Sequence, residues 1–342
     1  YGGVPIELEE VASPKNNYTR ASKEQVLAQA EEDVLFAAQH LADIKAVKDG
    51  EITSAAAYHL LSEIYLAEGK NREAVDAATK VIENPSLSLM QKRFGSRMNE
   101  QGDVYWDLFR RNNQNRSAGN TEGIWVIQFE TNVPGGGSST ATLKLTGNYM
   151  LERHFVPMTR DVKLTVDGKK LSPFNWPIGD YTGGRGIGWG ISTKYFSNKI
   201  WEDDFSGDIR NSNYNFVRKF PVNNSSFKAA TGIDTIDVDN PPAGLIVGQG
   251  NSTEIPGRYL FAYQTKATTP FNHPAELYQD ASSLLLKSIA GTTYVDQYMF
   301  RLSETYLLRA EAYIGLGEKD KAAADINVVR ARAHAKPVDA SK

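Results

Sequence analysis

The sequence predicts a mainly α protein in which tetratricopeptide-like helical hairpins flank a long, loop-rich insert that contains a few short strands. Three observations predict this fold class. One helical-hairpin pattern occupies residues 301–333, and a second pattern of the same design occupies residues 53–83. Between roughly residues 86 and 298, helical periodicity fades, and glycine, asparagine and aromatic residues become frequent.

The chain begins with an extended lead, "YGGVPIELEE" (1–10), and a helix follows it. Ser22 and Gln25 form a capping-box pattern, in which each side chain can accept a hydrogen bond from a free backbone N–H of the first turn. The apolar residues after this cap share one helical face. They are Val26, Ala30, Val34, Ala37 and Leu41.

In residues 53–83, two apolar stripes are separated by Gly69, and Pro85 stops the second helix. Alanine dominates the seam between the two predicted helices, and this allows their backbones to approach closely while a tyrosine fills the remaining gap. The stripes consist of Ala57, Leu61, Ile64 and Tyr65, then Ala74, Ala77, Ala78, Val81 and Ile82.

The insert offers only short strand candidates, of which "IWVIQFE" (124–130) and "YLFAYQTK" (259–266) are the clearest. After it, residues 301–333 repeat the earlier design, with Gly315 and Gly317 breaking the first helix. Aligned on the turn glycine, the two hairpins match over a period of about 34 residues, which is the tetratricopeptide period. The matched pairs are Tyr58 with Tyr306, Tyr65 with Tyr313, Gly69 with Gly317 and Ala74 with Ala322.

These patterns divide the chain into residues 1–85, the insert 86–298 and a closing hairpin 299–342. Such hairpins cannot bury their apolar faces alone, so we expect the first and last parts to pack together as one interlocked unit. With 342 residues, 41% hydrophobic, the chain can bury a sizeable core. Its net charge of −3 and scattered basic residues argue against nucleic-acid binding, and no apolar run is long enough to cross a bilayer.

The closing stretch resembles the C-terminal signature of the SusD/RagB-like outer-membrane nutrient-binding lipoproteins. Three further segments agree with that family in the same order: residues 1–6, 122–130 and 188–216, the last with the triplet Asp208, Ile209 and Arg210. The signature residues are Arg301, Glu304, Tyr306, Leu307, Leu308, Ala310, Glu311, Ala312, Ile326, Asn327, Arg330 and Arg332.

The resemblance implies a surface-exposed outer-membrane lipoprotein that works with a SusC-like TonB-dependent transporter. Such a protein captures an oligosaccharide and passes it inward without cleaving it, and it needs no cofactor. The resemblance also implies that this chain is a fragment lacking the N-terminal third and the extreme C-terminus. The lipid anchor would then lie upstream, which accounts for the absence of cysteine.

The polar residues offer little catalytic chemistry. A glycosidase needs two facing carboxyl groups, whereas the adjacent acids 202–204 are typical of a solvated surface, and Asp208 beside Arg210 indicates a salt bridge. No metal site is expected, because the five histidines lack the short spacings of metal motifs. They are His40, His59, His154, His273 and His334. We therefore expect a protein that is not an enzyme.

The charged residues of the closing hairpin lie at helical spacing, which favours a structural ion-pair network along and across the hairpin; docking against the transporter is the alternative. The residues concerned are the polar Asn327 and the charged Arg301, Glu304, Glu311, Arg330 and Arg332.

A sugar-binding site needs an aromatic face for the apolar side of a pyranose and polar groups for its hydroxyls. The segment 172–190 supplies both on irregular backbone, although loop tryptophans also cover cores, and Trp189 within "GWG" fits that structural role as well. The predicted ligand-binding residues are Asn175, Trp176, Asp180, Tyr181, Arg185 and Trp189.

Two other functions stay open. One is a tetratricopeptide scaffold that binds peptides in a helical groove, although the long aromatic-rich insert argues against a pure scaffold. The other is a lid protein of the same family that serves peptide nutrients. The sequence does not distinguish among glycans.

Overall fold

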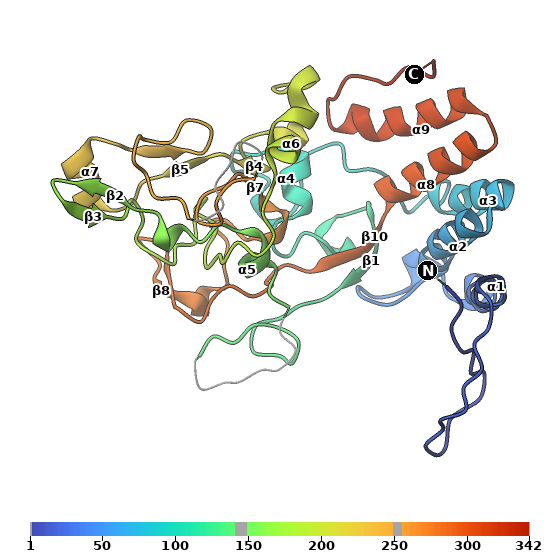
Figure 1. Cartoon of the computed structure of the whole chain (residues 1–342). Helices are drawn as coiled ribbons and strands as arrows, with labels where there is room; N and C mark the ends of the chain where they lie inside the picture. The colour runs from blue at the N-terminus through green and yellow to red at the C-terminus, as the bar shows by residue number, and fades with distance from the viewer. Residues whose placement is uncertain (1, 141–148, 249–254, 342) are drawn as a thin grey trace.

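A computed structural model describes residues 2–140, 149–248 and 255–341 of the chain (Figure 1). The predicted insert 86–298 therefore contains two stretches that lie outside the described residues. Among the described helices, none combines the length and hydrophobicity needed to span a bilayer.

The fold is mainly α, as predicted, with short strands confined almost entirely to the insert. The α-helices are α1 (Lys23–His40), α2 (Ser54–Glu68), α3 (Asn71–Ile82), α4 (Val104–Leu108), α5 (Leu151–Phe155), α6 (Lys194–Ser197), α7 (Ser225–Thr231), α8 (Leu302–Gly315) and α9 (Lys319–Arg332). The strands are β1 (Gly123–Ile127), β2 (Leu164–Val166), β3 (Lys169–Leu171), β4 (Phe216–Val217), β5 (Lys219–Pro221), β6 (Thr235–Asp237), β7 (Tyr263–Gln264), β8 (Tyr278–Asp280), β9 (Leu285–Leu286) and β10 (Gln297–Arg301).

Local signals in the sequence set the ends of the long helices. The capping box at Ser22 and Gln25 is present at the start of α1, with both reciprocal hydrogen bonds formed. Gly69 and Gly317 follow α2 and α8 in the left-handed conformation, with φ of 77° and 75°, which a residue without a Cβ adopts at no steric cost. The predicted capped helix and both predicted hairpins are confirmed.

The five long helices form one stack in the order α1, α2, α3, α8, α9, so that α3 of the first hairpin lies against α8 of the second (Figure 1). Small residues line this seam: Ala74 and Ala312 are almost fully buried beside Tyr65. Across the second hairpin, Arg309 donates two hydrogen bonds to the Asp325 carboxylate, at 2.8 and 2.7 Å. Helices more than 200 residues apart in the chain thus share one apolar interface.

A two-stranded antiparallel ladder of β1 and β10 joins the insert to the helical stack. Gly123 is the register partner of Arg301, and the Leu302 N–H donates to the Glu122 carbonyl at 2.9 Å. Since α8 begins directly after β10, this ladder fixes where the closing hairpin leaves the insert. The division at 85/86 and 298/299 stays a prediction about domain organisation.

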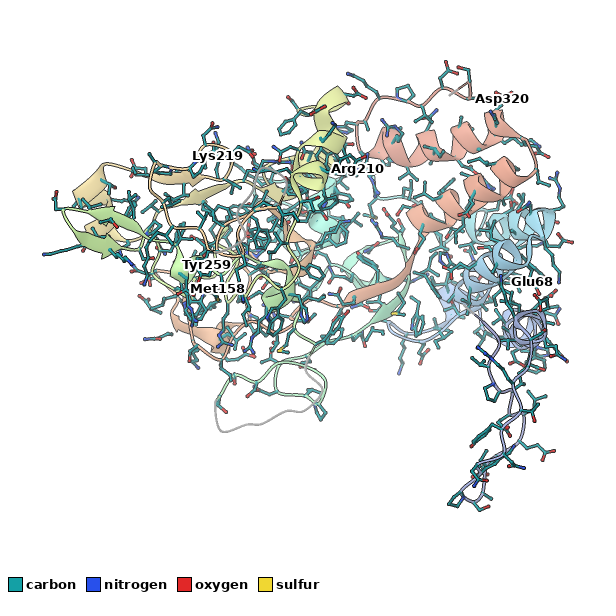
Figure 2. The ribbon with its side chains drawn as sticks, in the orientation of Figure 1. Glu68, Met158, Arg210, Lys219, Tyr259 and Asp320 are labelled. Atoms are coloured by element: carbon teal, nitrogen blue, oxygen red, sulfur yellow. The ribbon has the colours of Figure 1, made fainter. Side chains whose placement is uncertain are left out.

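The insert folds around its own aromatic core, and the side chains of Figure 2 crowd its interior. The short antiparallel pairs β4–β7 and β5–β6 supply residues of this core, and β2–β3 packs against it. The β8–β9 pair packs in a separate apolar cluster with Leu277 and Tyr294. Its fully buried rings include Phe216, Phe220, Phe227, Phe261 and Tyr263. The predicted strand at 259–266 contracts to Tyr263–Gln264, because the preceding apolar residues enter the core from a turn and not from a ladder.

Two arginines of the closing hairpin, Arg301 and Arg332, form ion pairs that helical spacing does not predict. Arg301 and Arg332 both pair with Glu122, at 3.1 and 2.5 Å, and this corrects the expectation that Glu304 and Glu311 supply their carboxylates. The reason is strand pairing: β10 lies on β1, so Arg301 is carried to the residue just before β1. Glu304 and Glu311 are exposed on α8.

The two remaining predicted structural residues hold the tail that follows α9. The Asn327 side chain exchanges two hydrogen bonds with the backbone of Val338, and Arg330 Nε donates to the Lys336 carbonyl at 2.5 Å. Asn327 and Arg330 therefore anchor the chain end to its own helix, and they do not pair across the hairpin with the acids of α8.

Candidate functional site

The segment 172–190, which supplies the six predicted ligand-binding residues, winds across the insert and does not gather them at one place. Ile178 bridges both Gly184 and Leu285, so the segment closes on itself and also contacts the β8–β9 region. The six residues consequently fall into three different surroundings.

Asp180 and Tyr181 face the interior of the insert. Asp180 is only 8% exposed; one of its carboxylate oxygens accepts the Thr182 N–H at 2.7 Å, and burial raises its pKa. The Tyr181 ring meets Phe271 edge-on at 4.9 Å, and burial raises its pKa to about 12. Tyr181 also lines a hollow of about 580 Å³ that includes Tyr214. The Tyr181 side chain therefore packs against Phe271 and also borders this hollow.

Trp176 lies among cations. The guanidinium groups of Arg160 and Arg185 lie 5.3 and 5.7 Å from its ring centroid, within the range of cation–π attraction. Exposed Asn175 is tied to Asn223, which accepts its backbone N–H at 2.7 Å. Trp176 and Arg185 therefore do meet, but the arginines already occupy part of the space around the ring that a sugar would need.

Trp189 is the most exposed aromatic of the six. Its side chain is 52% exposed, and its ring meets His154 edge-on with centroids 4.8 Å apart. The flanking glycines make this placement possible. Gly188 has φ of 65°, and a Cβ on Gly190 would lie 2.9 Å from the ring of Phe155, so larger residues would push the loop off α5.

Three backbone hydrogen bonds fasten the Trp189 loop to α5. Ile187 and Gly188 donate to the Arg153 carbonyl at 3.0 and 3.2 Å, and Gly190 donates to the His154 carbonyl at 2.7 Å. A half-exposed ring on a fastened loop loses little conformational entropy on binding, which is the property of a preorganised platform. Trp189 is therefore better placed than Trp176 to contact a ligand.

A pocket of about 440 Å³ opens beside this loop. Apolar walls come from α5, α6 and the residues after Trp189, and a rim of amide and ammonium groups comes from β7, η7 (Thr265–Ala267) and β10. Its volume lies within the usual range for small-ligand sites. Its lining residues are Leu151, Phe155, Gly190, Ile191, Ser192, Phe196, Gln264, Lys266, Ala267 and Gln297.

This composition suits a polyhydroxylated ligand. Phe155 is 46% exposed and Phe196 is 39% exposed, so flat apolar surfaces remain available for the C–H face of a ring. Gln264 and Gln297 can each donate and accept hydrogen bonds, which matches hydroxyl groups that do both. Sequence reasoning missed Phe155, Phe196 and both glutamines, because they lie outside segment 172–190 and no local motif connects them to it.

A buried acid–base pair fixes the position of the predicted segment. Glu152 and His273 are both fully buried, and His273 Nε2 lies 2.7 Å from the Glu152 carboxylate. The other Glu152 oxygen accepts the Arg185 N–H at 2.8 Å. This pair ties α5 to the middle of the segment, so it positions the loop without facing the pocket.

Two of the carboxylates considered for catalysis, those of Asp208 and Asp204, have structural partners. Asp208 pairs with Arg210 in the salt bridge predicted from the sequence, and it also accepts the Arg210 N–H at 3.0 Å. In the acidic cluster, Asp204 accepts the Lys336 N–H at 3.3 Å, and the Asp203 carbonyl accepts from the Lys336 ammonium at 2.5 Å. Asp203 and Asp204 therefore brace the end of the chain against the insert, and Asp208 is held by Arg210.

The sequence model of the SusD family matches residues 106–342, more than half of the chain. The chain belongs to the SusD family. The match covers the insert and the closing hairpin, and it agrees with the resemblance found in the sequence. No curated protein sequence matches the chain.

Solved structures give the same fold. A laminarin-binding SusD-like protein superposes with a TM-score of 0.60 at 19% identity, over 98% of this chain and 60% of that one. Surface glycan-binding protein A from Bacteroides uniformis superposes with a TM-score of 0.55 at 15% identity, over 99% of this chain and 56% of that one. A protein of the same name from Bacteroides thetaiotaomicron, in complex with laminarihexaose, gives a TM-score of 0.53 at 16% identity, over 93% of this chain and 55% of that one. This SusD-family chain spans between half and two thirds of the length of these proteins.

Proposed function

We propose that this SusD-family chain forms part of a cell-surface protein that binds an oligosaccharide and does not cleave it. The observation that carries the proposal is the half-exposed Trp189 ring, fastened to α5 beside a pocket with aromatic walls and an amide rim. Stacking on the aromatic surface would hold the ring of a sugar, and the rim would fix its orientation through hydroxyl groups.

Family membership supports the choice of ligand class. Three of the structurally similar proteins are named for laminarin or glycan binding, and one of them was solved with laminarihexaose. We propose further that the protein acts at the outer surface of the outer membrane, attached through a lipid anchor. There it would close over a SusC-like TonB-dependent transporter and hand the bound ligand to it.

The experiment that tests the binding proposal is affinity electrophoresis and calorimetry of the chain against a panel of soluble polysaccharides that includes laminarin. We expect Trp189→Ala to weaken binding at least about tenfold, since central aromatic contacts dominate such interfaces. Phe36→Ala is the matched control: Phe36 is an exposed aromatic, 63% accessible, on α1 of the helical stack.

Two further variants locate the site. Loss of binding in Trp176→Ala or Tyr181→Ala, with Trp189→Ala unaffected, would move the site to the arginine-flanked tryptophan or to the 580 Å³ hollow. Cleavage of a bound glycan would contradict the non-catalytic proposal. If peptides bind and no glycan does, the alternative of a peptide-binding lid or scaffold replaces the glycan proposal.

A further inference from the structure

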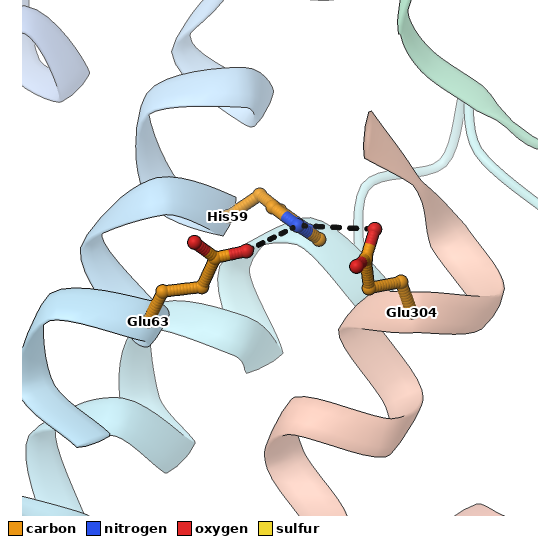
Figure 3. Close-up of side chains that lie close together, drawn as sticks. All are labelled: His59, Glu63 and Glu304. Atoms are coloured by element: carbon orange, nitrogen blue, oxygen red, sulfur yellow. Dashed lines mark ion pairs between the residues drawn. The ribbon is translucent and has the colours of Figure 1, made fainter. Parts of the chain in front are cut away.

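Three side chains far from the candidate glycan site converge between α2 and α8. His59 and Glu63 lie one turn apart on α2, and Glu304 lies in the first turn of α8 (Figure 3). One ligand atom from each side chain lies within 4.8 Å of the other two. The cluster thus links residues that are more than 240 positions apart.

His59 is the unusual member, because it is fully buried while its Nε2 atom makes no hydrogen bond with any described residue. That atom points at the Glu63 and Glu304 carboxylates, 3.4 and 3.7 Å away (Figure 3). A buried nitrogen without a hydrogen-bond partner is costly, so a native structure normally supplies it with one.

The rest of the His59 ring is fixed. Its Nδ1 atom lies 2.8 Å from the hydroxyl of buried Thr305, and the Phe300 ring packs over it with centroids 4.3 Å apart. When Nδ1–H donates to Thr305, Nε2 presents a lone pair to the two carboxylates. A metal-binding histidine is oriented in the same way, by a hydrogen bond at its other ring nitrogen.

The distances from His59 Nε2 to the two carboxylates suit a shared metal cation better than a shared proton. An N–H···O hydrogen bond is typically about 2.9–3.0 Å long, shorter than both distances from Nε2. Two ligands bound to tetrahedral zinc at about 2.0–2.1 Å lie roughly 3.3–3.4 Å apart. One imidazole nitrogen and two carboxylate oxygens form a ligand set that zinc and similar divalent metals accept.

We propose that His59, Glu63 and Glu304 bind a divalent transition-metal ion of the zinc type that joins the two tetratricopeptide hairpins. The ion would complete its coordination with solvent, because the Glu63 and Glu304 side chains are 38% and 52% exposed and leave an open approach. Arg301 does not compete for Glu304, since Glu122 holds its guanidinium group. No short sequence motif predicts this site, because Glu304 lies on α8, near the opposite end of the chain from the other two ligands.

The test is a titration of zinc sulfate into the metal-free chain. Calorimetry measures the binding, and thermal denaturation measures the change in Tm. We expect saturable binding of one ion, and a rise in Tm of about 3–5 °C at a hundred times Kd. Glu63→Gln and Glu304→Gln should each weaken binding at least about tenfold, because losing one of three ligands removes a large part of the affinity. These variants are preferred to changes at His59, whose burial makes unfolding a competing explanation.

Glu311→Gln is the matched control, because Glu311 is exposed two turns along α8 and lies outside the cluster. It should bind zinc like the unaltered chain. Absence of saturable binding would overturn the proposal, and so would equal affinity in all three variants, which would assign the ion to another histidine. Preference for magnesium over zinc would also contradict it, since imidazole is a poor ligand for magnesium.

Discussion

At the scale of single residues, Asp180 illustrates how a residue suited to a binding site can serve the fold instead. A carboxylate in an irregular, aromatic-rich loop is a reasonable candidate for hydroxyl recognition. In the structure it is buried and accepts the N–H of Thr182, two residues further along, as aspartate commonly does in turns. Spacing alone does not separate these roles, because the difference lies in whether the surrounding core covers the carboxylate.

Because Asp180 is buried, its contribution to folding stability should depend on pH in the opposite sense to that of an exposed, hydrogen-bonded aspartate. Its folded pKa is raised by burial, so the stability that it contributes is full below its unfolded pKa and is lost as pH rises through the folded value. Asparagine does not titrate, and its side-chain oxygen can still accept from Thr182. The Tm of Asp180→Asn minus that of the unaltered chain should therefore increase from about pH 3 to about pH 7 in thermal melts.

Asp280 is the control of opposite sign. It is exposed, and hydrogen bonds from Ser283 and Ser282 lower its pKa to about 2. Its contribution is present above the unfolded pKa and is lost as pH falls towards 2. The same Tm difference for Asp280→Asn should then decrease over the same interval. Matching trends in both variants would contradict the assignment of the Asp180 effect to burial.

At the scale of elements, the sequence predicts what depends on neighbours within a few residues. The capping box at Ser22, the turn glycines Gly69 and Gly317 and the alanine seams are all local patterns, and all appear as expected. What the sequence does not predict is which strand Arg301 joins. That depends on the β1–β10 ladder, whose partners are at least 170 residues apart.

The same limit applies to the candidate glycan site. The sequence points to an aromatic-rich segment, and the structure presents Trp189 from it beside a pocket. The apolar walls of that pocket come from α5, α6 and the residues after Trp189, and its polar rim comes from β7, η7 and β10. Aromatic content is visible in the sequence, whereas exposure is decided by packing, which leaves Trp189 half exposed and turns Asp180 inward.

The buried Glu122 is the residue on which the β1–β10–α9 junction depends electrostatically. Its two oxygens receive Arg301 and Arg332, and the Met90 N–H adds a third hydrogen bond at 3.2 Å. Glu122→Gln keeps the shape but leaves two guanidinium groups without a counter-charge. Breaking a buried pair in this way costs about 3–5 kcal/mol, so we expect a loss of this size in the free energy of unfolding.

Chemical denaturation monitored by circular dichroism measures this effect. Glu311→Gln is the control, because an exposed glutamate on α8 should change the free energy of unfolding by less than about 0.5 kcal/mol. Equal stability of the two variants would mean that the junction relies on apolar packing and not on the buried charges.

At the scale of the whole molecule, the chain closes on itself twice. The β10 strand returns to β1, and α8 returns to α3, so the helical stack contains both the first and the last helices of the described chain (Figure 1). Neither hairpin buries its apolar face without the other, which is the general property of stacked helical repeats. The insert is consequently held at both of its ends by one layer of helices.

This closure predicts that the closing hairpin is required for the helical stack to fold. A chain ending at Asp296 would lack β10, α8 and α9, and it would expose the apolar seam of α3 that Ala312 and its neighbours otherwise cover. Exposed seams of this kind favour aggregation or loss of cooperative unfolding. Thermal melts and near-ultraviolet circular dichroism should show no cooperative transition for the helices of this shortened chain.

A chain ending at Lys336 provides the comparison, because it retains α9 and the contacts of Lys336 with the acidic cluster but loses the hydrogen bonds between Asn327 and Val338. It should melt cooperatively, since only a surface anchor has been removed. Cooperative melting of the chain ending at Asp296, with an unchanged midpoint, would instead mean that α1, α2 and α3 fold independently. The closing hairpin would then be an attached module, and its packing against α3 would contribute nothing to the stability of α1, α2 and α3.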